Sequence, residues 1–230
     1  MNTLTKYNVP FSKSKAVEAI TAAKLTYDYT YVLDQYICLA VLPSNLGFVL
    51  QKNKTTEILI ALRGSQEFED FIQDAKVMLI QTPFGSIHKG FYEDFQLLMP
   101  AIAHSLQQLQ MHEHYKITVT GHSLGAALAP IIAYVLKLLA HDDKWHFSFD
   151  VQVYVAALPK VSDESFTENY SLMEIPTWAF CNIHDVVTQI PEGFGYVPLV
   201  DYIDVEFQHH CIVKNHSIDN YLHLITGFKS

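Results

Sequence analysis

Three residues in the sequence are of the types that support nucleophilic catalysis, and each follows a stretch that reads as a β-strand. Ser123 lies between two glycines in VTGHSLGAALA, Asp185 lies in CNIHDVVTQIP, and His216 lies in KNHSIDNYLHL. A serine hydroxyl is a weak nucleophile, so it needs a neutral imidazole to accept its proton and a carboxylate to orient that imidazole. The three residues together predict acyl transfer from an ester to water through an acyl-enzyme.

The serine has the local context that a GxSxG motif requires. Ser123 follows the strand-like run ITVT and opens an alanine- and leucine-rich helical stretch. Side chains at Gly121 or Gly125 are expected to collide with the neighbouring strand and helix. The amide of Leu124 would then point to a developing oxyanion. The alternative is an ordinary serine N-cap in a glycine-rich turn.

The candidate acid is chosen by its position along the chain. Asp185 comes just after the strand-like run 176–183 and precedes Pro191, so a loop at a strand end is expected. Asp163 lies one strand too early, while Asp201 and Asp204 lie beside or within a later strand. The alternative role for Asp185 is turn formation.

The candidate base follows the last predicted strand. His216 lies where the closing helix begins, whereas His209 and His210 end a strand, where adjacent side chains point to opposite faces. That alternation also disfavours a metal site at His209, His210 and the following cysteine. We expect the His223 side chain to face solvent or core and the His122 side chain to point away from the site.

Strand-like and helical segments alternate along the chain. The predicted strands are 36–43, 47–53, 56–64, 116–121, 151–158, 176–183 and 202–207. The predicted helices are 14–29, 91–115, 123–140, a short one at 163–171 and a closing one from about residue 216. This order predicts an α/β fold with a mostly parallel central sheet flanked by helices. No linker or repeat divides it, so residues 1–230 are predicted to form a single domain.

Composition narrows the partners and the compartment. A net charge of −9 disfavours nucleic acid and anionic membrane surfaces as partners. The N-terminal stretch has no apolar core of the kind a secretory signal needs, and no run approaches the roughly 20 apolar residues of a spanning helix. The expected compartment is the cytoplasm, with signal-independent export left open. The three cysteines are expected to be buried free thiols.

These motifs together resemble the class 3 lipase family of α/β hydrolases, which includes the fungal triacylglycerol lipases. The resemblance runs from about residue 20 to 225 and rests on six segments: ALRGSQEFEDFIQDA, HKGFYEDF, VTGHSLGAALA, YVAALPKVSDESF, CNIHDVVTQIP and NHSIDNYL. It implies Ser123 as nucleophile, Asp185 as acid and His216 as base. It also implies an oxyanion hole formed by Ser65 and Leu124, with no metal or cofactor.

The sequence departs from the family pattern in two loops. Ala156 and Ala157 replace a Gly-Ser pair, and Ser162 replaces a glycine, so this loop is expected to follow a different path. Val186 stands where many members carry proline, which leaves the loop of the acid less constrained.

The segment 66–82 bears on the substrate. Apolar residues at helical spacing predict an amphipathic helix: Phe68, Phe71, Ile72, Ala75 and Leu79. The resemblance implies a lid over an acyl pocket and transient contact with a lipid interface; the alternative is a helix that packs on the core. Pro83, Phe84, Gly85 and the loop 193–200 are candidate pocket walls.

The sequence leaves several functions open. A lipase acting on acylglycerols or other lipid esters is the first, and a phospholipase or an acyltransferase would use the same residues. A non-catalytic hydrolase-fold binding protein is the alternative, which would usually lack one of the three residues. Because His216 must begin neutral, activity is expected to rise with pH through a group of pKa ~6.5 to 7.

Overall fold

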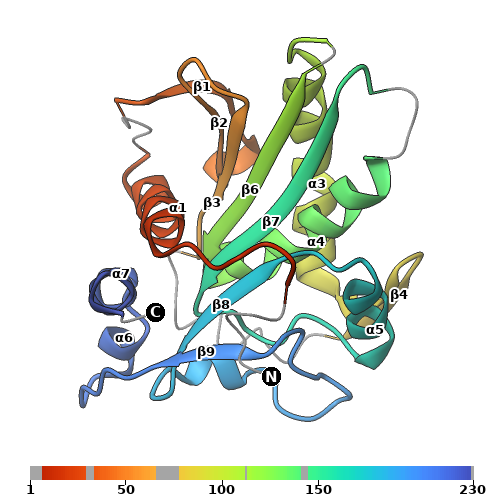
Figure 1. Ribbon diagram of the computed structural model, residues 1–230. Helices are drawn as coiled ribbons and strands as arrows, with labels where there is room; N and C mark the ends of the chain where they lie inside the picture. The colour runs from red at the N-terminus through yellow and green to blue at the C-terminus, as the bar shows by residue number, and fades with distance from the viewer. Residues whose placement is uncertain (1–6, 30–33, 66–77, 112, 141–144, 229–230) are drawn as a thin grey trace.

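The central feature of the molecule is a twisted sheet whose strands end together at one edge. The computed structural model describes residues 7–29, 34–65, 78–111, 113–140 and 145–228. In these residues the sheet has seven strands in the order β1-β2-β3-β6-β7-β8-β9 (Figure 1). Their bounds are β1 Tyr36–Val41, β2 Gly47–Lys52, β3 Glu57–Leu62, β6 His114–His122, β7 Ser148–Ala156, β8 Thr177–Asn182 and β9 Tyr202–Val205.

The sheet is mostly parallel, as predicted. β2 pairs antiparallel with both β1 and β3, whereas β3, β6, β7, β8 and β9 pair in parallel. In the parallel part, His122 pairs with Ala156 and Asn182 pairs with Val205 at the strand ends. The loops that follow these strands therefore leave from the same edge, where the α/β topology places reactive groups.

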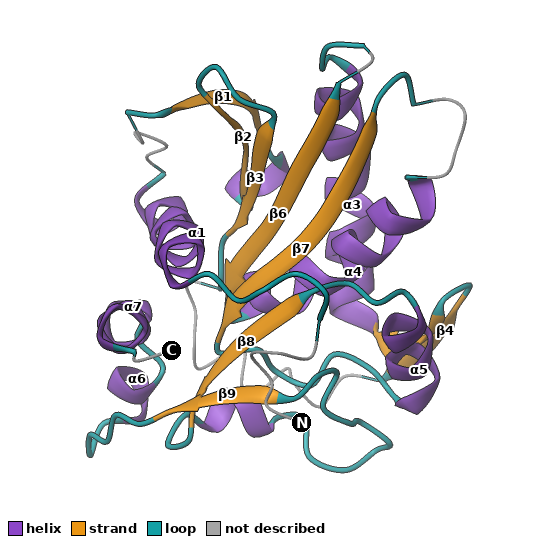
Figure 2. Ribbon diagram, viewed as in Figure 1, coloured by secondary structure: helices purple, strands orange, loops and turns teal. Residues whose placement is uncertain are grey.

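Helices cover both faces of the sheet (Figures 1 and 2). One apolar core lies between the sheet and α1 and α7, and another lies between the sheet and α3, α4 and α5. The described helices are α1 Lys13–Leu25, α3 Lys89–Gln107, α4 Leu124–Leu139, α5 Glu164–Leu172, α6 Ile212–Asn215 and α7 Ile218–Gly227, with short 3₁₀ helices at Thr26–Asp28, Pro43–Asn45 and Val186–Gln189. The closing helix predicted from about residue 216 is α7, and the short helix α6 just before His216 was not predicted.

β6 shows why the sequence forms a buried strand here. From Ile117 to His122 its residues are buried on both faces, which is typical of a central parallel strand. The stretch ends at the turn that carries Ser123, and α4 continues as a helix whose first turns are almost wholly buried. The apolar strand and helix thus hold this turn rigidly at the sheet edge.

The region after β3 differs from the sequence prediction. Residues 66–77, which make up most of the proposed lid 66–82, lie outside the described residues. Leu79 does not extend a helix, because Leu79–Thr82 forms strand β4 and pairs antiparallel with β5 at Gly85–His88. The helical spacing of Leu79 relative to the preceding apolar residues therefore misled the prediction.

The turn of this hairpin packs on the core. Thr82 Oγ1 donates a hydrogen bond to the carbonyl of Gly85, whose φ of +121° favours glycine. The Phe84 ring packs against the rings of Phe95 and Tyr134, on α3 and α4. Phe84 thus belongs to a helix-side core and anchors the hairpin there.

The cysteines only partly follow the prediction. All three are free, but Cys181 is buried, Cys38 is half-buried and Cys211 is exposed. Cys211 lies in the loop before α6 rather than in a buried strand, so the apolar residues around it did not indicate burial.

Candidate active site

Ser123 occupies a strained turn between β6 and α4. Its φ of +58° and ψ of −122° are rare for a residue with a side chain, a conformation that costs about 1–3 kcal/mol. A Cβ on Gly121 would meet the backbone of Gly125, and one on Gly125 would meet the carbonyls of Leu62 and Arg63. The two glycines therefore allow the sharp turn and the close approach of α4 to β3.

The Ser123 hydroxyl does not cap its helix. Although Ser123 is the N-cap residue of α4, its side chain makes no capping hydrogen bond, so the alternative of an ordinary N-cap serine is wrong. The residue is 3% exposed, and its amide donates to the carbonyl of Ala156 at the end of β7. A backbone hydrogen bond to β7 thus holds the turn, while the Ser123 hydroxyl is not used as a helix cap.

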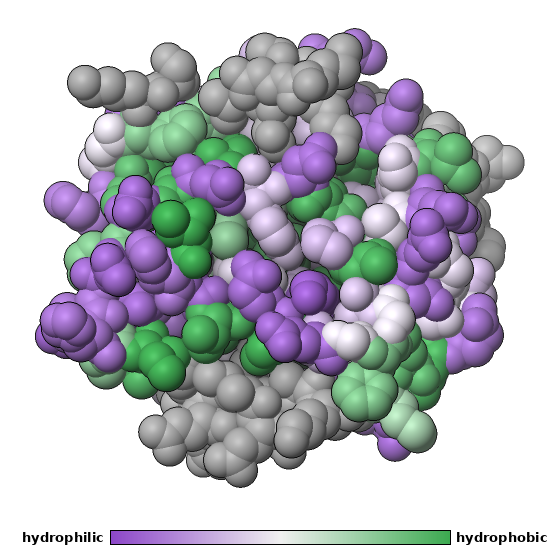
Figure 3. Space-filling model, turned by 90° about the horizontal axis from the view of Figure 1, so that it is seen from below, coloured by the Kyte–Doolittle hydropathy of each residue, from purple (hydrophilic) through white to green (hydrophobic). Residues whose placement is uncertain are grey.

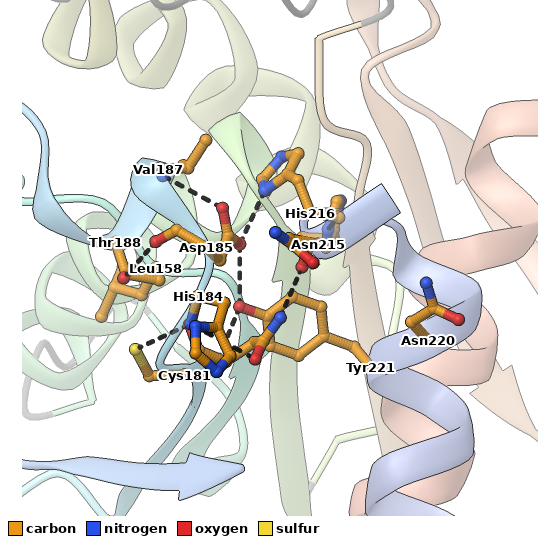
Figure 4. A network of polar contacts seen from close by, with 12 residues as sticks. Leu158, Cys181, His184, Asp185, Val187, Thr188, Asn215, His216, Asn220 and Tyr221 are labelled. Carbon is orange, nitrogen blue, oxygen red and sulfur yellow. Dashed lines mark hydrogen bonds and ion pairs between the residues drawn. The ribbon is translucent and has the colours of Figure 1, made fainter. Parts of the chain in front are cut away.

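Asp185 lies in the loop after β8, as the sequence predicts, and is 1% exposed (Figure 4). Its Oδ2 atom accepts hydrogen bonds from His216 Nδ1 and from the Tyr221 hydroxyl, both at 2.8 Å. Its Oδ1 atom accepts from the amide of Val187 at 3.0 Å. Three donors thus satisfy the hydrogen-bonding capacity of this buried side chain and fix its orientation.

His216 lies between α6 and α7 and is 5% exposed. Because a carboxylate only accepts, Nδ1 of His216 carries the proton in its bond to Asp185. That tautomer makes Nε2 the basic nitrogen of the ring. The His216 ring lies 4.5 Å, between centroids, from the ring of His122, the residue before Ser123. The structure therefore brings Ser123, Asp185 and His216 to the same sheet edge.

Two side-chain amides fix the loop that carries His216. Asn182, the last residue of β8, donates to the carbonyls of Phe207 and Asn215 at 2.9 Å and accepts from the Phe207 amide. Asn215 bonds in turn to both backbone groups of His209. The strand end that leads to Asp185 is thereby joined to the loop that ends at His216.

The turn after β3 lies against the serine. A Cβ on Gly64 would come within 2.8 Å of the His122 carbonyl and 3.1 Å of the Ser123 Cβ. Ser65 is the next residue and is half-buried. Leu124 is the first residue of α4, so its N–H has no acceptor within the helix. Ser65 thus follows a glycine that lies against Ser123, and Leu124 follows Ser123 directly in the chain.

The competing acids have other surroundings. Asp163 caps α5 by accepting from the amides of Ser165 and Phe166. Asp201 and Asp204 are exposed. Asp185, by contrast, is buried and bonds to His216, which supports the choice made from chain order.

The competing histidines are also accounted for. His209 Nδ1 accepts from the amide of Cys211, and His210 and His223 are exposed. In the described part of the chain, no group of three or more His, Cys, Asp or Glu side chains is placed to hold a metal ion. Among the described residues, no helix is long and apolar enough to cross a membrane.

Sequence reasoning missed Tyr221 and misjudged His122. The Tyr221 hydroxyl donates to Asp185 and accepts from the amide of Asn182. Burial raises its pKa well above the usual tyrosine value, and the Asp185 carboxylate raises it further, so the hydroxyl stays protonated. The only sequence signal was a tyrosine five residues after His216 on the buried side of a helix.

We expected the His122 side chain to point away from the site, but it lies beside His216. It is 3% exposed and packs between Tyr27 and His216. Burial lowers its pKa well below the usual histidine value, with a further contribution from the nearby His216 ring. The prediction failed because α1, which precedes β6 in the chain, and α7, which follows it, cover that side of the strand.

Comparisons with known proteins agree with this geometry. Residues 59–194 match the family model for class 3 lipases. The chain is 30% identical over 156 residues to a lipase of Rhizomucor miehei, covering 66% of this chain and 42% of that protein. It is 28% identical over 163 residues to the chloroplastic phospholipase A1-Igamma3 of Arabidopsis thaliana, covering 60% and 31%. The chain thus spans less than half the length of these relatives.

A solved structure shows the same fold. The R. miehei triacylglyceride lipase superposes with a TM-score of 0.63 at 21% identity, over 79% of this chain and 74% of that one. This similarity, together with the mostly parallel sheet flanked by helices, shows an α/β-hydrolase fold. The family match includes the turn at Ser65, the Ser123 elbow and the Asp185 loop. The chain therefore belongs to the class 3 lipase family.

Proposed function

We propose that the chain is a serine carboxylic ester hydrolase that acts on acylglycerols or other lipid esters. The observation that carries the proposal is the buried hydrogen bond between Asp185 and His216, at the sheet edge where Ser123 has a strained, uncapped backbone. A carboxylate fixes the imidazole tautomer, and the imidazole can then act as a general base.

The reaction follows from these roles. Ser123 Oγ attacks the ester carbonyl carbon while its proton passes to His216 Nε2, giving a tetrahedral oxyanion. The C–O bond to the alcohol breaks as the imidazolium returns that proton to the leaving oxygen, which leaves an acyl-serine. Water then attacks the acyl carbon with the same proton transfers and releases the carboxylic acid. Asp185 orients the imidazole and stabilises its charge throughout.

The oxyanion is held by backbone amides. The amide of Leu124 at the start of α4 and the amide of Ser65, with its hydroxyl, are the proposed donors. Their support is the contact of the Gly64 turn with Ser123 and the position of Leu124 in the first turn of a 16-residue helix. Loss of one such donor typically costs about 10²–10³ in kcat.

Lipid esters are the proposed substrate class. Apolar side chains are exposed on the loops that follow β8 and on α6: Ile183, Val186, Phe194, Ile212 and Val213. Figure 3 views the molecule from the end where β6 and β7 finish and shows apolar patches between polar ones. We propose transient contact of this face with a lipid interface, together with the segment 66–82. The names of the relatives support the same class.

A phospholipase is the second candidate, because one relative is a phospholipase A1 and the proposed chemistry is unchanged. An acyltransferase would differ only in the acceptor that meets the acyl-serine. A non-catalytic binding protein is disfavoured because the Ser123, Asp185 and His216 side chains are all present at one edge.

The test is a chain-length series of chromogenic esters, together with a phosphatidylcholine, hydrolysed by the wild type and by Ser123→Ala. We expect turnover by the wild type only, with a preference for longer acyl chains presented at an interface. Equal turnover by the two proteins would contradict catalysis by Ser123. A preference for short soluble esters without interfacial activation would contradict the lid proposal for 66–82 and leave the triad unaffected.

A further inference from the structure

We propose that Tyr27 and His122 are positioning residues that tie the Gly64–Ser65 turn to the backbone of His216 through one packing contact and two hydrogen bonds. The inference rests on the proposed function, since it assigns these residues a role in holding the oxyanion hole and the base in register. Neither side chain is placed to touch the reacting atoms, so neither is called catalytic.

The first link joins the turn to Tyr27, which lies in the 3₁₀ helix after α1. The Tyr27 hydroxyl packs directly against Gly64, since it is the nearest atom to the position that a Cβ on Gly64 would occupy. A glycine at 64 is therefore required for the tyrosine to approach the turn.

The second and third links pass through His122. Tyr27 Oη lies 2.8 Å from His122 Nδ1, and His122 Nε2 lies 2.8 Å from the carbonyl oxygen of His216. A carbonyl only accepts, so Nε2 carries the proton and Nδ1 is the acceptor. The Tyr27 hydroxyl must then donate to Nδ1, so both hydrogen bonds run from Tyr27 towards His216 and each donor has one acceptor.

This pattern needs a neutral His122. A protonated ring would carry a donor at Nδ1, so the Tyr27 hydroxyl would lose the acceptor for its own proton. It would also place a second positive charge beside His216, which becomes an imidazolium during the proposed reaction. Burial lowers the pKa of His122 well below its ordinary value, which keeps the ring neutral at working pH.

The chain connects elements that are far apart in sequence. Tyr27 and His122 are 95 residues apart, and His122 and His216 are 94 apart. The Gly64–Ser65 turn, the turn at Ser123 and His216 are thus joined by one set of contacts, so a displacement of one would displace the others. A small displacement of a catalytic group typically lowers the rate of reaction much more than it weakens the binding of substrate.

The experiment compares kcat and KM on a soluble p-nitrophenyl ester for the wild type, Tyr27→Phe, His122→Ala, His122→Gln and Ser123→Ala. Tyr170→Phe is the matched control, because this buried hydroxyl bonds to Thr177 at 2.7 Å, away from the site. We expect kcat to fall about 10-fold in Tyr27→Phe and about 100-fold in His122→Ala, with KM within about twofold. Tyr170→Phe should keep kcat within about twofold.

Rescue and tautomer measurements separate positioning from folding. His122→Gln can donate from about the position of Nε2, so it should recover at least about fivefold of the kcat lost in His122→Ala. Imidazole ¹⁵N NMR of the wild type should show His122 as the neutral Nε2–H tautomer. This measurement tests the positioning role even if His122→Ala does not fold. An imidazolium or an Nδ1–H tautomer would overturn the inference.

The outcomes distinguish the two proposals. Turnover that is lost in Ser123→Ala but unchanged in Tyr27→Phe and His122→Ala overturns only the positioning role. Turnover that survives in Ser123→Ala overturns the proposed function itself, and with it the inference.

Discussion

The two ends of the sheet carry the same three residue types in different surroundings. At the amino end of β6 and β7, His114 Nδ1 lies 2.9 Å from Ser148 Oγ, and Nε2 lies 3.0 Å from Asp150 Oδ2. At the carboxyl end are Ser123, Asp185 and His216. The amino end thus has a hydrogen-bonded Ser-His-Asp set, and the carboxyl end has a hydrogen-bonded Asp–His pair at the same edge as Ser123, so the residue types alone do not indicate catalysis.

Burial and backbone separate the two sets. The His114 and Asp150 side chains are 50% and 72% exposed, whereas those of His216 and Asp185 are 7% and 0% exposed. Water screens the first pair, so its hydrogen bonds contribute little to orientation. Ser148 lies within a regular strand and has no helix N-terminus behind it, unlike Ser123. The proposed nucleophile Ser123 thus differs from Ser148 in its environment and not in the types of its neighbours.

The amino end also holds an open cavity of about 920 Å³, lined by polar residues that include Gln152, Thr118 and Asp150. None of the proposed catalytic residues lines it. Its size makes it a candidate ligand site by volume alone, but the strained serine, the buried carboxylate and the helix N-terminus all lie at the other end. Volume is thus a poorer guide to chemistry here than strand direction.

The largest expected effect separates the two serines. Ser123→Ala should lower kcat for ester hydrolysis by about 10⁴-fold or more, because the reaction loses its covalent step. Ser148→Ala, the matched control at the amino end, should keep kcat within about twofold. Steady-state hydrolysis of a chromogenic ester measures both. Similar losses in the two variants would mean that the comparison between the ends is wrong.

The two carboxylates give the next effect. Asp185→Asn should lower kcat by about 10³–10⁴-fold, because an amide no longer favours the Nδ1–H tautomer of His216. Asp150→Asn should leave kcat unchanged within about twofold, since its partner His114 is half exposed. The same assay measures both, and circular dichroism checks that Asp185→Asn is folded. Retained activity in Asp185→Asn would exclude it as the orienting acid.

A smaller effect is expected from the hydroxyl behind Asp185. Tyr221→Phe removes one of the three donors to this carboxylate and should lower kcat about 5–10-fold. Tyr154→Phe is the control, because Tyr154 is also buried but its hydroxyl accepts from the Ser12 amide, far from the site. Equal kcat values for the two variants would show that Tyr221 serves only stability.

The smallest effect concerns stability rather than rate. Burial lowers the pKa of His88 to about 4 from 6.5. A lowered histidine pKa means that the unfolded chain binds the proton more readily, so this stability is present above pH 6.5 and is lost as the pH falls towards 4. The loss is up to about 3 kcal/mol of unfolding free energy.

Urea unfolding between pH 7 and 4 measures this loss. His88→Asn keeps a side chain that can accept from the Phe91 amide, as His88 does at the start of α3. The slope of unfolding free energy against pH should be shallower in this variant. An unchanged slope would mean that His88 is not the group responsible.

The order of helices and strands was predictable from the sequence. The strand ends that precede the proposed catalytic residues were predictable too. Apolar runs with turn residues between them predicted the seven strands of the sheet, and the positions of Ser123, Asp185 and His216 followed from strand direction. The β4–β5 hairpin was not predicted, because Leu79 continues an apolar helical spacing. Pro83 and Gly85 carried the turn signal but were read as pocket walls.

The supporting contacts depend on tertiary packing and were beyond sequence reasoning. Tyr221 reaches Asp185 only because α7 packs beside β8, across 36 residues of sequence. His122 was expected to point away, which alternation in an isolated strand would give, but Tyr27 and His216 enclose it. Alternation predicts the face of a strand and does not predict what covers that face.

The most direct test of the central claim is covalent labelling of the intact protein with a p-nitrophenyl alkylphosphonate, followed by mass spectrometry of the peptides. This reagent phosphonylates an activated serine and releases p-nitrophenol. We expect one adduct per chain, located on Ser123, with none on Ser148 and none in Ser123→Ala. An adduct on Ser148, or equal labelling of the wild type and Ser123→Ala, would contradict an acyl-transfer site at the carboxyl edge of the sheet.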